Sequence, residues 1–312
     1  MKKSTQFRKS IISANLRKKN RSRNYPDKKP WVIAAIAEEE RKPSDRLWKK
    51  APSADDAYTA RLQRVRFLQK FAKTDPTFRF CAERLDACEP RNRCLSGACP
   101  ECSRLFQRWF VRRSKQYIAK DIDEPSHELV AITIVPSTPI VRPGKLNNFS
   151  IINLQRRLKF ALDKNGVCDA IGGVDFSFNE DRNGKFKPHW SPHPYLITTT
   201  KNRLHLLAGL KKSFRRSKTV LRPVKIPTFQ NISRRRSYAL KMHFKRRVGY
   251  DQIKIVKGKI RKCRNADYQR LRAQERVELF KYLDQIGLAS RVIFRGAKPV
   301  VNLSGVQIKR IK

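Results

Sequence analysis

Five of the seven cysteines in this 312-residue chain fall within one segment, CAERLDACEPRNRCLSGACPEC. Cys99 and Cys102 form a Cys-Pro-x-Cys turn, which directs two thiolates at one tetrahedral ion. Cys94 lies five residues before Cys99, and either Cys88 or Cys81 can supply a fourth thiolate. Because Cys88 is nearer to the others than Cys81, the spacing predicts a structural zinc site with Cys88 as the fourth ligand. The predicted zinc ligands are Cys88, Cys94, Cys99 and Cys102.

Clustered cysteines can also form disulfides or remain as free buried thiols. The first residues, MKKSTQFRKSIISANL, lack the apolar core of a secretory signal, which argues against disulfides. Such clustering seldom arises by chance, which argues against unrelated free thiols. Cys168 and Cys263 stand alone in the sequence and are expected to be core or surface residues.

A second group with metal-ligating side chains lies in KPHWSPHPYLITTT, residues 187–200. In a regular strand, His189 and His193 would be ~13 Å apart, too far to share one ion. Residues two apart share a face at ~6.6 Å and can converge on an ion. The residue two positions after His193 is Tyr195, however, and a neutral phenol with an ordinary pKa of ~10 is a poor replacement for imidazole.

The charge of the chain indicates its partner. Lys and Arg number 72 against 26 Asp and Glu, a formal net charge of +46. A folded domain with this excess would repel itself, so a polyanion is expected to neutralise it, most commonly nucleic acid. An anionic membrane surface is the rival partner, but no apolar stretch approaches the ~18 residues of a membrane span.

Two segments concentrate this charge. Residues 1–30 contain eleven Lys or Arg and one acid, and are expected to form a disordered arm; residues 211–250 contain fourteen Lys or Arg and no acid. Phe214, Tyr238 and Phe244 are interleaved in the second run, which suits single-stranded or distorted DNA. A solvated basic surface with ordinary core aromatics is the alternative. The predicted DNA contacts are Arg234, Arg235, Arg236, Lys245, Arg246 and Arg247.

Helix and strand patterns alternate around these groups. Helical spacing marks residues 56–73, 103–120 (a basic amphipathic helix), 149–164 and 266–286. Strand patterns mark residues 127–135, 169–179, 193–200 and 290–294. This order predicts an α+β fold in which a small cysteine zinc knuckle precedes an antiparallel central sheet with flanking helices, and the 169–200 hairpin lies near the centre of that sheet.

The predicted organisation has five parts. They are a disordered basic arm (1–30), a helical segment (31–80), a zinc knuckle with a basic helix (81–120), an α+β domain (121–290) and a basic C-terminal tail (291–312).

The block GGVDFSFNEDRNGKFKPHWSPHPYLI resembles the metal-binding motif of HUH-superfamily rolling-circle replication initiators, the Rep-like proteins of plasmids and phages. That family carries histidine, a hydrophobic residue and histidine on a central strand, often after a Trp-x-Pro step, with an acidic residue nearby. WSPHPYLI fits this frame with His193 as the first histidine and Tyr195 in place of the second. The cysteine segment, AITIVPS and SYALKMHFK also resemble members of the family, so the similarity covers roughly residues 80–285.

The resemblance implies a Rep-like domain and a divalent cation, Mg or Mn, that polarises the scissile phosphate. His193 would be its retained ligand, and Glu180 or Asp175 would supply a carboxylate. His189 would join them if the neighbouring prolines bend the chain inward, and His205 is expected to be structural or exposed.

The family also uses a tyrosine nucleophile, which implies Tyr238 here, with Tyr250 as the second candidate. If this segment is a helix, Lys241 lies one turn after Tyr238 and would neutralise the phosphate. The alternative role of Tyr238 is a packed or base-stacking aromatic.

The implied function is DNA replication initiation in the bacterial cytoplasm for a plasmid or other mobile element. The protein would nick single-stranded or distorted origin DNA and work with the host replication machinery. The alternative is a non-catalytic, zinc-containing nucleic-acid-binding protein derived from such an initiator. Side chains that converge near Tyr238 would favour the enzyme, and a dispersed set would favour the binder.

Overall fold

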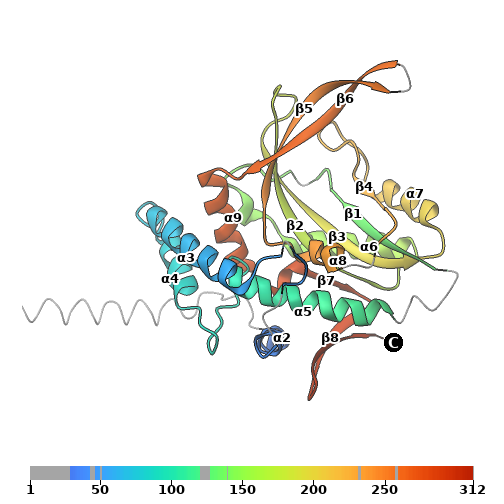
Figure 1. Ribbon diagram of the computed structural model, residues 1–312. Helices are drawn as coiled ribbons and strands as arrows, with labels where there is room; N and C mark the ends of the chain where they lie inside the picture. Colours follow the sequence, from blue (N-terminus) through green and yellow to red (C-terminus); the bar gives the residue numbers. More distant parts are fainter. Residues whose placement is uncertain are drawn as a thin grey trace, which may run out of the picture.

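The computed structural model describes residues 29–42, 46–49, 51–119, 127–138, 140–230, 233–256 and 259–311. The predicted basic arm therefore lies almost entirely outside the described residues. The helices are α2 (Pro30–Glu40), α3 (Ala54–Phe71), α4 (Pro76–Asp86), α5 (Pro100–Ala119), α6 (Ile151–Lys164), α7 (Arg203–Ser213), α8 (Ser233–Ser237) and α9 (Ala273–Ile286), with 3-10 turns η1 (Leu146–Asn148), η2 (Tyr238–Leu240) and η3 (Ala289–Arg291) (Figure 1). None of the described helices is both long enough and apolar enough to cross a bilayer.

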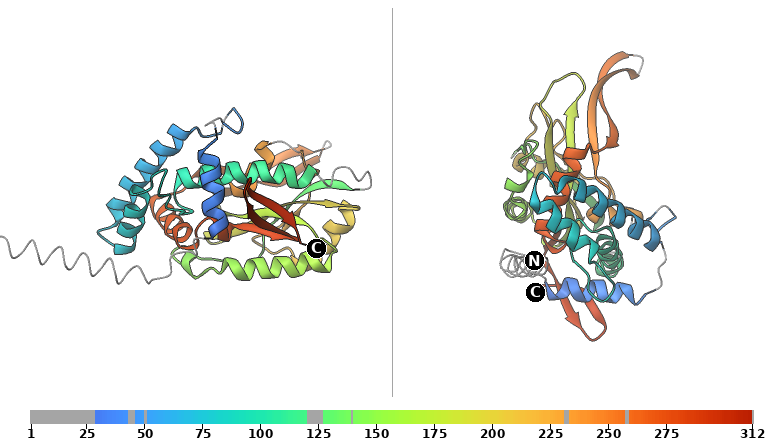
Figure 2. Two further views of the ribbon diagram at one scale, coloured as in Figure 1. Left: turned by 90° about the horizontal axis from the view of Figure 1, so that it is seen from below. Right: turned by 90° about the vertical axis from the view of Figure 1, so that its left-hand side faces the viewer.

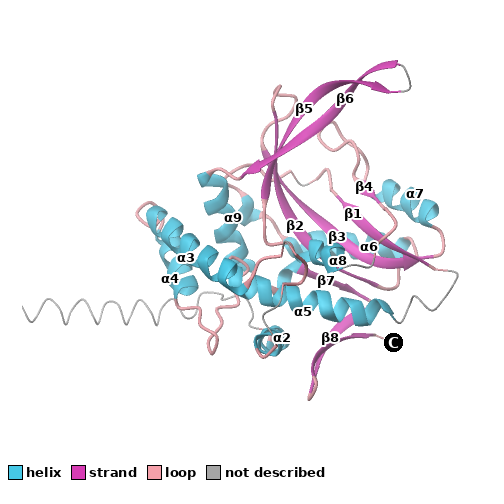
Figure 3. Cartoon of the chain, in the orientation of Figure 1, coloured by secondary structure: helices cyan, strands magenta, loops and turns pink. Residues whose placement is uncertain are grey.

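The strands form one large, mostly antiparallel sheet and one separate hairpin (Figure 3). The large sheet has the order β4-β1-β3-β2-β5-β6, with β7 also paired to β2, and β8 pairs with β9. Only the β2–β5 pair is parallel among the described strands. The bounds are β1 (Glu128–Ile134), β2 (Ala170–Asp181), β3 (His189–Thr200), β4 (Val224–Lys225), β5 (Lys245–Val256), β6 (Lys259–Arg270), β7 (Val292–Arg295), β8 (Ala297–Asn302) and β9 (Gly305–Arg310). The α+β class and the central β2–β3 hairpin are as predicted.

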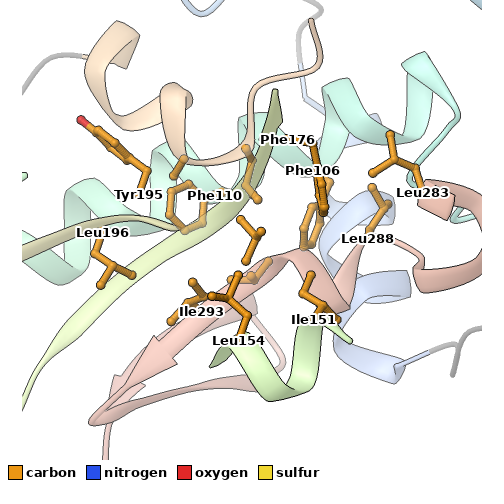
Figure 4. Close-up of a cluster of buried hydrophobic side chains, with 14 of the residues drawn as sticks. Phe106, Phe110, Ile151, Leu154, Phe176, Tyr195, Leu196, Leu283, Leu288 and Ile293 are labelled. Atoms are coloured by element: carbon orange, nitrogen blue, oxygen red, sulfur yellow. The ribbon is translucent and has the colours of Figure 1, made fainter. Parts of the chain in front are cut away.

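The alternating residues of β2 divide the sheet into an apolar and a polar face. Phe176 and Phe178 lie on the apolar face. The ring of Phe176 packs edge-on against that of Tyr282 of α9, with 5.4 Å between the ring centres. The buried cluster continues to Leu154 of α6 and Ile293 of β7 (Figure 4). Helices α5 and α6 lie on opposite sides of the sheet, which is clear when it is viewed from below (Figure 2). The sheet is therefore a central layer between helices, and the polar face lies towards α5.

Strand β3 begins at His189, four residues earlier than predicted. Pro192 and Pro194 are tolerated inside this strand because their missing N–H groups would point to the side on which β3 has no strand partner at these positions. The N–H of Trp190 donates to Val141 on the β1 side of the strand (2.8 Å), and Pro192 and Pro194 have the same orientation in the ladder. The last β1 residue paired with β3 is Thr133, opposite Tyr195, so both prolines lie past the paired part of β1 and no ladder bond to it is lost.

Helix α5 differs from the predicted basic amphipathic helix. Phe106, Trp109 and Phe110 are buried, and the Arg108 guanidinium lies 3.4 Å from the buried Glu39 carboxylate of α2. The helix lies in the centre of the molecule because α2 covers it, and the sequence pattern of α5 alone could not show this covering helix.

The C-terminal region also differs from prediction. Residues 266–270 belong to β6, and the last helix begins only at Ala273. β7 overlaps the strand predicted at residues 290–294, but residues 297–310 form the hairpin β8–β9 instead of a tail. The hairpin β8–β9 is held by long-range contacts: the Trp109 indole donates to the Val306 carbonyl (3.1 Å), and the Val306 N–H donates to Glu38 (3.0 Å).

Candidate metal centre and sheet-face site

The four predicted zinc ligands converge in the structure. The Sγ atoms of Cys88, Cys94, Cys99 and Cys102 all lie within 4.8 Å of one another. The sulfur of Cys102 is 3.5 Å from that of Cys88 and 3.6 Å from that of Cys94. A tetrahedral zinc with Zn–S bonds of ~2.3 Å places its sulfurs ~3.8 Å apart, so this donor set fits a structural zinc ion. We call these four residues the cysteine cluster.

Cys81 is outside this group, which settles the choice that the spacing left open. Its side chain is buried on α4, and burial raises the pKa of its thiol. The two isolated cysteines are placed as expected, since Cys168 is exposed and Cys263 is partly buried.

The loop before α5 gives the cysteine cluster its shape. Leu95 has a φ of 56°, the left-handed region in which a non-glycine residue is uncommon. A Cβ at Gly97 would lie 2.7 Å from the Leu283 carbonyl oxygen, so only glycine lets the loop approach α9 this closely. The Arg93 guanidinium lies 3.7 Å from the Cys88 sulfur and 2.7 Å from Glu40, and so places positive charge beside the thiolates.

On the polar face of the sheet, Asp175 of β2 lies directly opposite His193 of β3. The Asp175 side chain is fully buried, and its Oδ2 lies 3.1 Å from His193 Nε2. The Lys241 ammonium contacts the same oxygen. Burial alone would raise the pKa of Asp175, but Lys241 and His193 lower it to about 2. The site therefore contains a buried, ionised carboxylate that fixes a lysine.

Tyr238 lies beside this lysine on η2. Its side chain is 43% exposed, and the Lys241 ammonium is 5.1 Å from the centre of its ring. The ring of Tyr195 lies 4.9 Å from that of Tyr238, and its hydroxyl points away from the apolar cluster (Figure 4). Burial raises the pKa of Tyr238, and it raises the pKa of Tyr195 to about 12. We call Asp175, His193, Tyr238 and Lys241 the sheet-face site.

Three residues that the sequence did not single out position the tyrosine. A Cβ at Gly173 would lie 2.2 Å from the Ala239 carbonyl oxygen, so glycine is needed for η2 to rest on β2. Gln107 of α5 donates to the carbonyls of residues 237 and 240, at 2.9 and 3.2 Å. Arg291 donates to the Lys241 carbonyl at 3.0 Å. The one available signal was the Gly-Gly pair inside a strand, which marks a close approach of another segment.

The other two predicted cation ligands do not reach His193. The Glu180 carboxylate is bound by Arg246 and Arg272, each at 3.0 Å. His189 is four residues from His193 in the same continuous strand, and its Nδ1 lies 2.9 Å from the Lys187 carbonyl oxygen. Asp175, which was the alternative to Glu180 as the predicted carboxylate ligand, is the carboxylate that lies beside His193.

The sheet-face site does not fit a divalent cation in this arrangement. Both nitrogens of His193 face oxygen atoms, Nδ1 at 2.9 Å from the Ser191 carbonyl and Nε2 at 3.1 Å from Asp175. The Asp175 oxygen is shared with Lys241, and the second histidine position is Tyr195. Among the described residues, a close group of three or more metal-ligating side chains occurs only at the cysteine cluster.

The six predicted DNA-binding residues separate into two classes. Arg234, Arg235, Lys245 and Arg247 are exposed. Arg236 is only 3% exposed on α8, which packs against α5, and Arg246 is held by Glu180. His205 is exposed.

The chain matches no protein-family model, no curated protein and no solved structure.

Proposed function

We propose that this chain is a DNA-binding protein with a structural zinc ion that cleaves single-stranded DNA through Tyr238, as a replication initiator does. One observation carries the proposal: an exposed phenol lies next to a lysine that a buried carboxylate holds in place. A lysine that only stabilised the fold would not need to lie beside an exposed tyrosine at the edge of a basic surface.

In the proposed reaction, Tyr238 Oη attacks the phosphorus atom of a phosphodiester. A bond forms between Oη and phosphorus, and the bond between phosphorus and the 3′ oxygen breaks. The phenol loses its proton, and the departing 3′ oxygen gains one, so the products are a 5′-phosphotyrosine and a free 3′-hydroxyl. No net charge is gained or lost.

Lys241 supplies the positive charge for this step. Burial lowers the pKa of Lys241, but Asp175 outweighs this effect and raises it, so the side chain is an ammonium ion at neutral pH. Its charge stabilises the negative charge that develops on the phosphoryl oxygens. Asp175 acts as a positioning residue because its carboxylate holds the ammonium, and His193 contacts the same carboxylate oxygen.

The surroundings of the sheet-face site favour a polyanionic substrate. Arg234 and Arg235 are exposed on α8, directly before Tyr238 in the sequence. Lys245 and Arg247 are exposed on β5, shortly after Lys241. Phosphate groups on both sides of the scissile bond would thus meet positive charge.

A second function, single-strand binding without cleavage, is favoured by the tyrosine pair. The rings of Tyr195 and Tyr238, 4.9 Å apart, form an aromatic platform on which bases can stack. In that case Lys241 would bind phosphate, and the hydroxyl of Tyr238 would not react.

A covalent-adduct assay separates the two functions. The protein is incubated with labelled random-sequence single-stranded DNA and resolved on a denaturing gel. We expect an adduct with the wild type and with the control Tyr250→Phe, and none with Tyr238→Phe, whose DNA affinity should be unchanged because only a hydroxyl is lost. An adduct formed by Tyr238→Phe would overturn the assignment, and wild-type binding without an adduct would favour the second function.

A further inference from the structure

Strands β5 and β6 form a two-stranded ribbon that extends beyond the rest of the molecule (Figure 1 and Figure 2). β5 pairs with β2 only from Arg246 to Gly249. From Tyr250 outward it pairs with β6 alone among the described strands. At ~3.3 Å per residue, the seven residues of β5 beyond this point project roughly 23 Å.

The base of the ribbon is anchored, so its direction is fixed. The Arg182 guanidinium in the β2–β3 turn lies 3.0 Å from Asp267 and 5.1 Å from the centre of the Tyr250 ring. Lys185 in the same turn contacts Asp251. The outer part, in contrast, has no strand partner outside the ribbon among the described strands.

Three isoleucines lie exposed on the outer part. Ile253, Ile255 and Ile260 are 72%, 76% and 77% exposed. Ile255 pairs directly with Ile260, and Ile253 pairs with Lys262, so the register places all three on one face of the ribbon. Each buried isoleucine contributes ~1.5–3 kcal/mol relative to an exposed one. A contiguous exposed group of this kind marks an interaction surface.

The charge around these isoleucines identifies the partner class. Residues 250–265 contain six Lys or Arg and one acid, Asp251. The Lys262 side chain, which shares the isoleucine face, is 70% exposed. A protein partner with an apolar pocket would not require such a charge excess, whereas a polyanion would.

The ribbon also connects with the sheet-face site. A pocket of about 510 Å³ lies between the polar face of the sheet and the base of the ribbon, and His189, Ser191, Arg247 and Arg264 are among its lining residues. His189 and Ser191 belong to the same face of β3 as His193. A nucleic acid that occupies the sheet-face site can therefore continue along the ribbon.

From these observations we propose that the β5–β6 ribbon is an arm that inserts its isoleucine face into a groove of double-stranded DNA. A two-stranded ribbon fits the major groove, which is ~12 Å wide. Isoleucines can contact thymine methyl groups there, or wedge between base steps in the minor groove. The inference rests on the DNA binding in the proposed function but not on the chemistry of Tyr238. It adds a duplex contact to the single-stranded site.

The test compares two hairpins of the same chain. The ribbon variant is Ile253→Ser/Ile255→Ser/Ile260→Ser. The matched control is Val301→Ser/Leu303→Ser in the hairpin β8–β9, where both side chains are also exposed. Affinities for a labelled random-sequence duplex and for a labelled single strand are measured by fluorescence anisotropy, and circular dichroism verifies that both variants are folded.

We expect the ribbon variant to bind the duplex at least about tenfold more weakly, which corresponds to ~1.4 kcal/mol or more. Its affinity for the single strand and its adduct yield should stay at the wild-type level, and the control should match the wild type in all three measurements.

Unchanged duplex affinity of the ribbon variant would overturn the proposal, as would an equal loss in the control. Membrane binding is tested with vesicles of phosphatidylserine and phosphatidylcholine. If the wild type binds these vesicles, and the ribbon variant does not but keeps its duplex affinity, the arm is assigned to membranes instead. A wild type that binds single strands but no duplex refutes only the arm. A wild type that binds neither refutes the proposed function as well.

Discussion

The cysteine cluster and the sheet-face site are both small groups of polar side chains, but the chain assembles them in different ways. The cluster takes four identical donors from residues 88–102, one loop and the start of one helix. The sheet-face site takes its members from β2, β3 and the end of η2, up to 66 positions apart in the sequence (241 − 175 = 66). The first needs only a loop that closes on a metal, whereas the second needs three elements to be packed correctly.

Helix α5 connects the two groups. It begins in the cysteine cluster, where Cys102 lies in its first turn, and it carries Gln107, which holds the segment of Tyr238. Loss of the cluster should therefore disturb the sheet-face site, but disturbance of the sheet-face site should leave the cluster intact. The following predictions test this asymmetry.

The largest effect is expected from Cys99→Ser. Structural zinc contributes an apparent ~10 kcal/mol or more in small domains, and a set of three thiolates binds it less well. The wild type is expected to contain about one zinc ion per chain, and the variant should lose this ion. It should also lose amide protection in residues 80–115 and form no adduct. Metal analysis and hydrogen exchange measure this, with exposed Cys168→Ser as the control. A wild type purified under reducing conditions without zinc would contradict the prediction.

The next largest effect is expected from Lys241→Ala. Removing a charge that stabilises the transition state should slow adduct formation roughly 10²-fold, while zinc content stays at the wild-type level. The matched control is Lys245→Ala, which removes an exposed lysine four residues away. Equal rates for the two variants would show that Lys241 serves only to neutralise Asp175.

A smaller effect is expected from Gln107→Met. This change removes two hydrogen bonds to the Tyr238 segment but keeps a side chain of similar length. Two bonds of ~1 kcal/mol each predict a loss of about tenfold in adduct formation. Zinc content and single-strand affinity should not change. The control is Gln116→Met, an exposed residue of the same helix. A fall in zinc content would mean that the two groups are coupled in both directions.

The smallest effect is expected from added metal. Because the Lys241 ammonium contacts the Asp175 oxygen beside His193, and Tyr195 stands in place of the second histidine, Mn²⁺ added to protein in metal-depleted buffer should change the rate of adduct formation by less than about twofold. The measurement is a rate against Mn²⁺ concentration, with zinc content verified at each point. A rate that rises strongly and saturates would show that the imidazole of His193 turns to bind a cation, as the family resemblance implies.

Much of the fold could be predicted because local patterns are strong where the core is regular. The alternation of Val174, Phe176 and Phe178 with polar residues correctly predicted β2 as a strand, and the order of the elements correctly placed its hairpin with β3 near the centre of the sheet. The ribbon, in contrast, was missed entirely. In its outer part only Ile253 and Ile255 alternate with polar residues, and this run is too short to identify a strand. The first residues of β6 were likewise not recognised as a strand, and residues 266–270 were assigned to the following helix.

The sequence by itself determined Cys94, Cys99 and Cys102 as ligands, because donors of one type that lie close along the chain need little more than a turn to converge; the structure settled the fourth ligand as Cys88 and not Cys81. It also determined the pairing of Tyr238 with Lys241, since the two residues lie only three positions apart in the sequence. Only the tertiary structure decided that Asp175, and not Glu180, meets His193 and Lys241. The two carboxylates lie five positions apart on one strand and therefore face opposite sides of the sheet. Arginines from β5 and the start of α9 neutralise Glu180, whereas the packing of η2 on Gly173 brings Lys241 to Asp175.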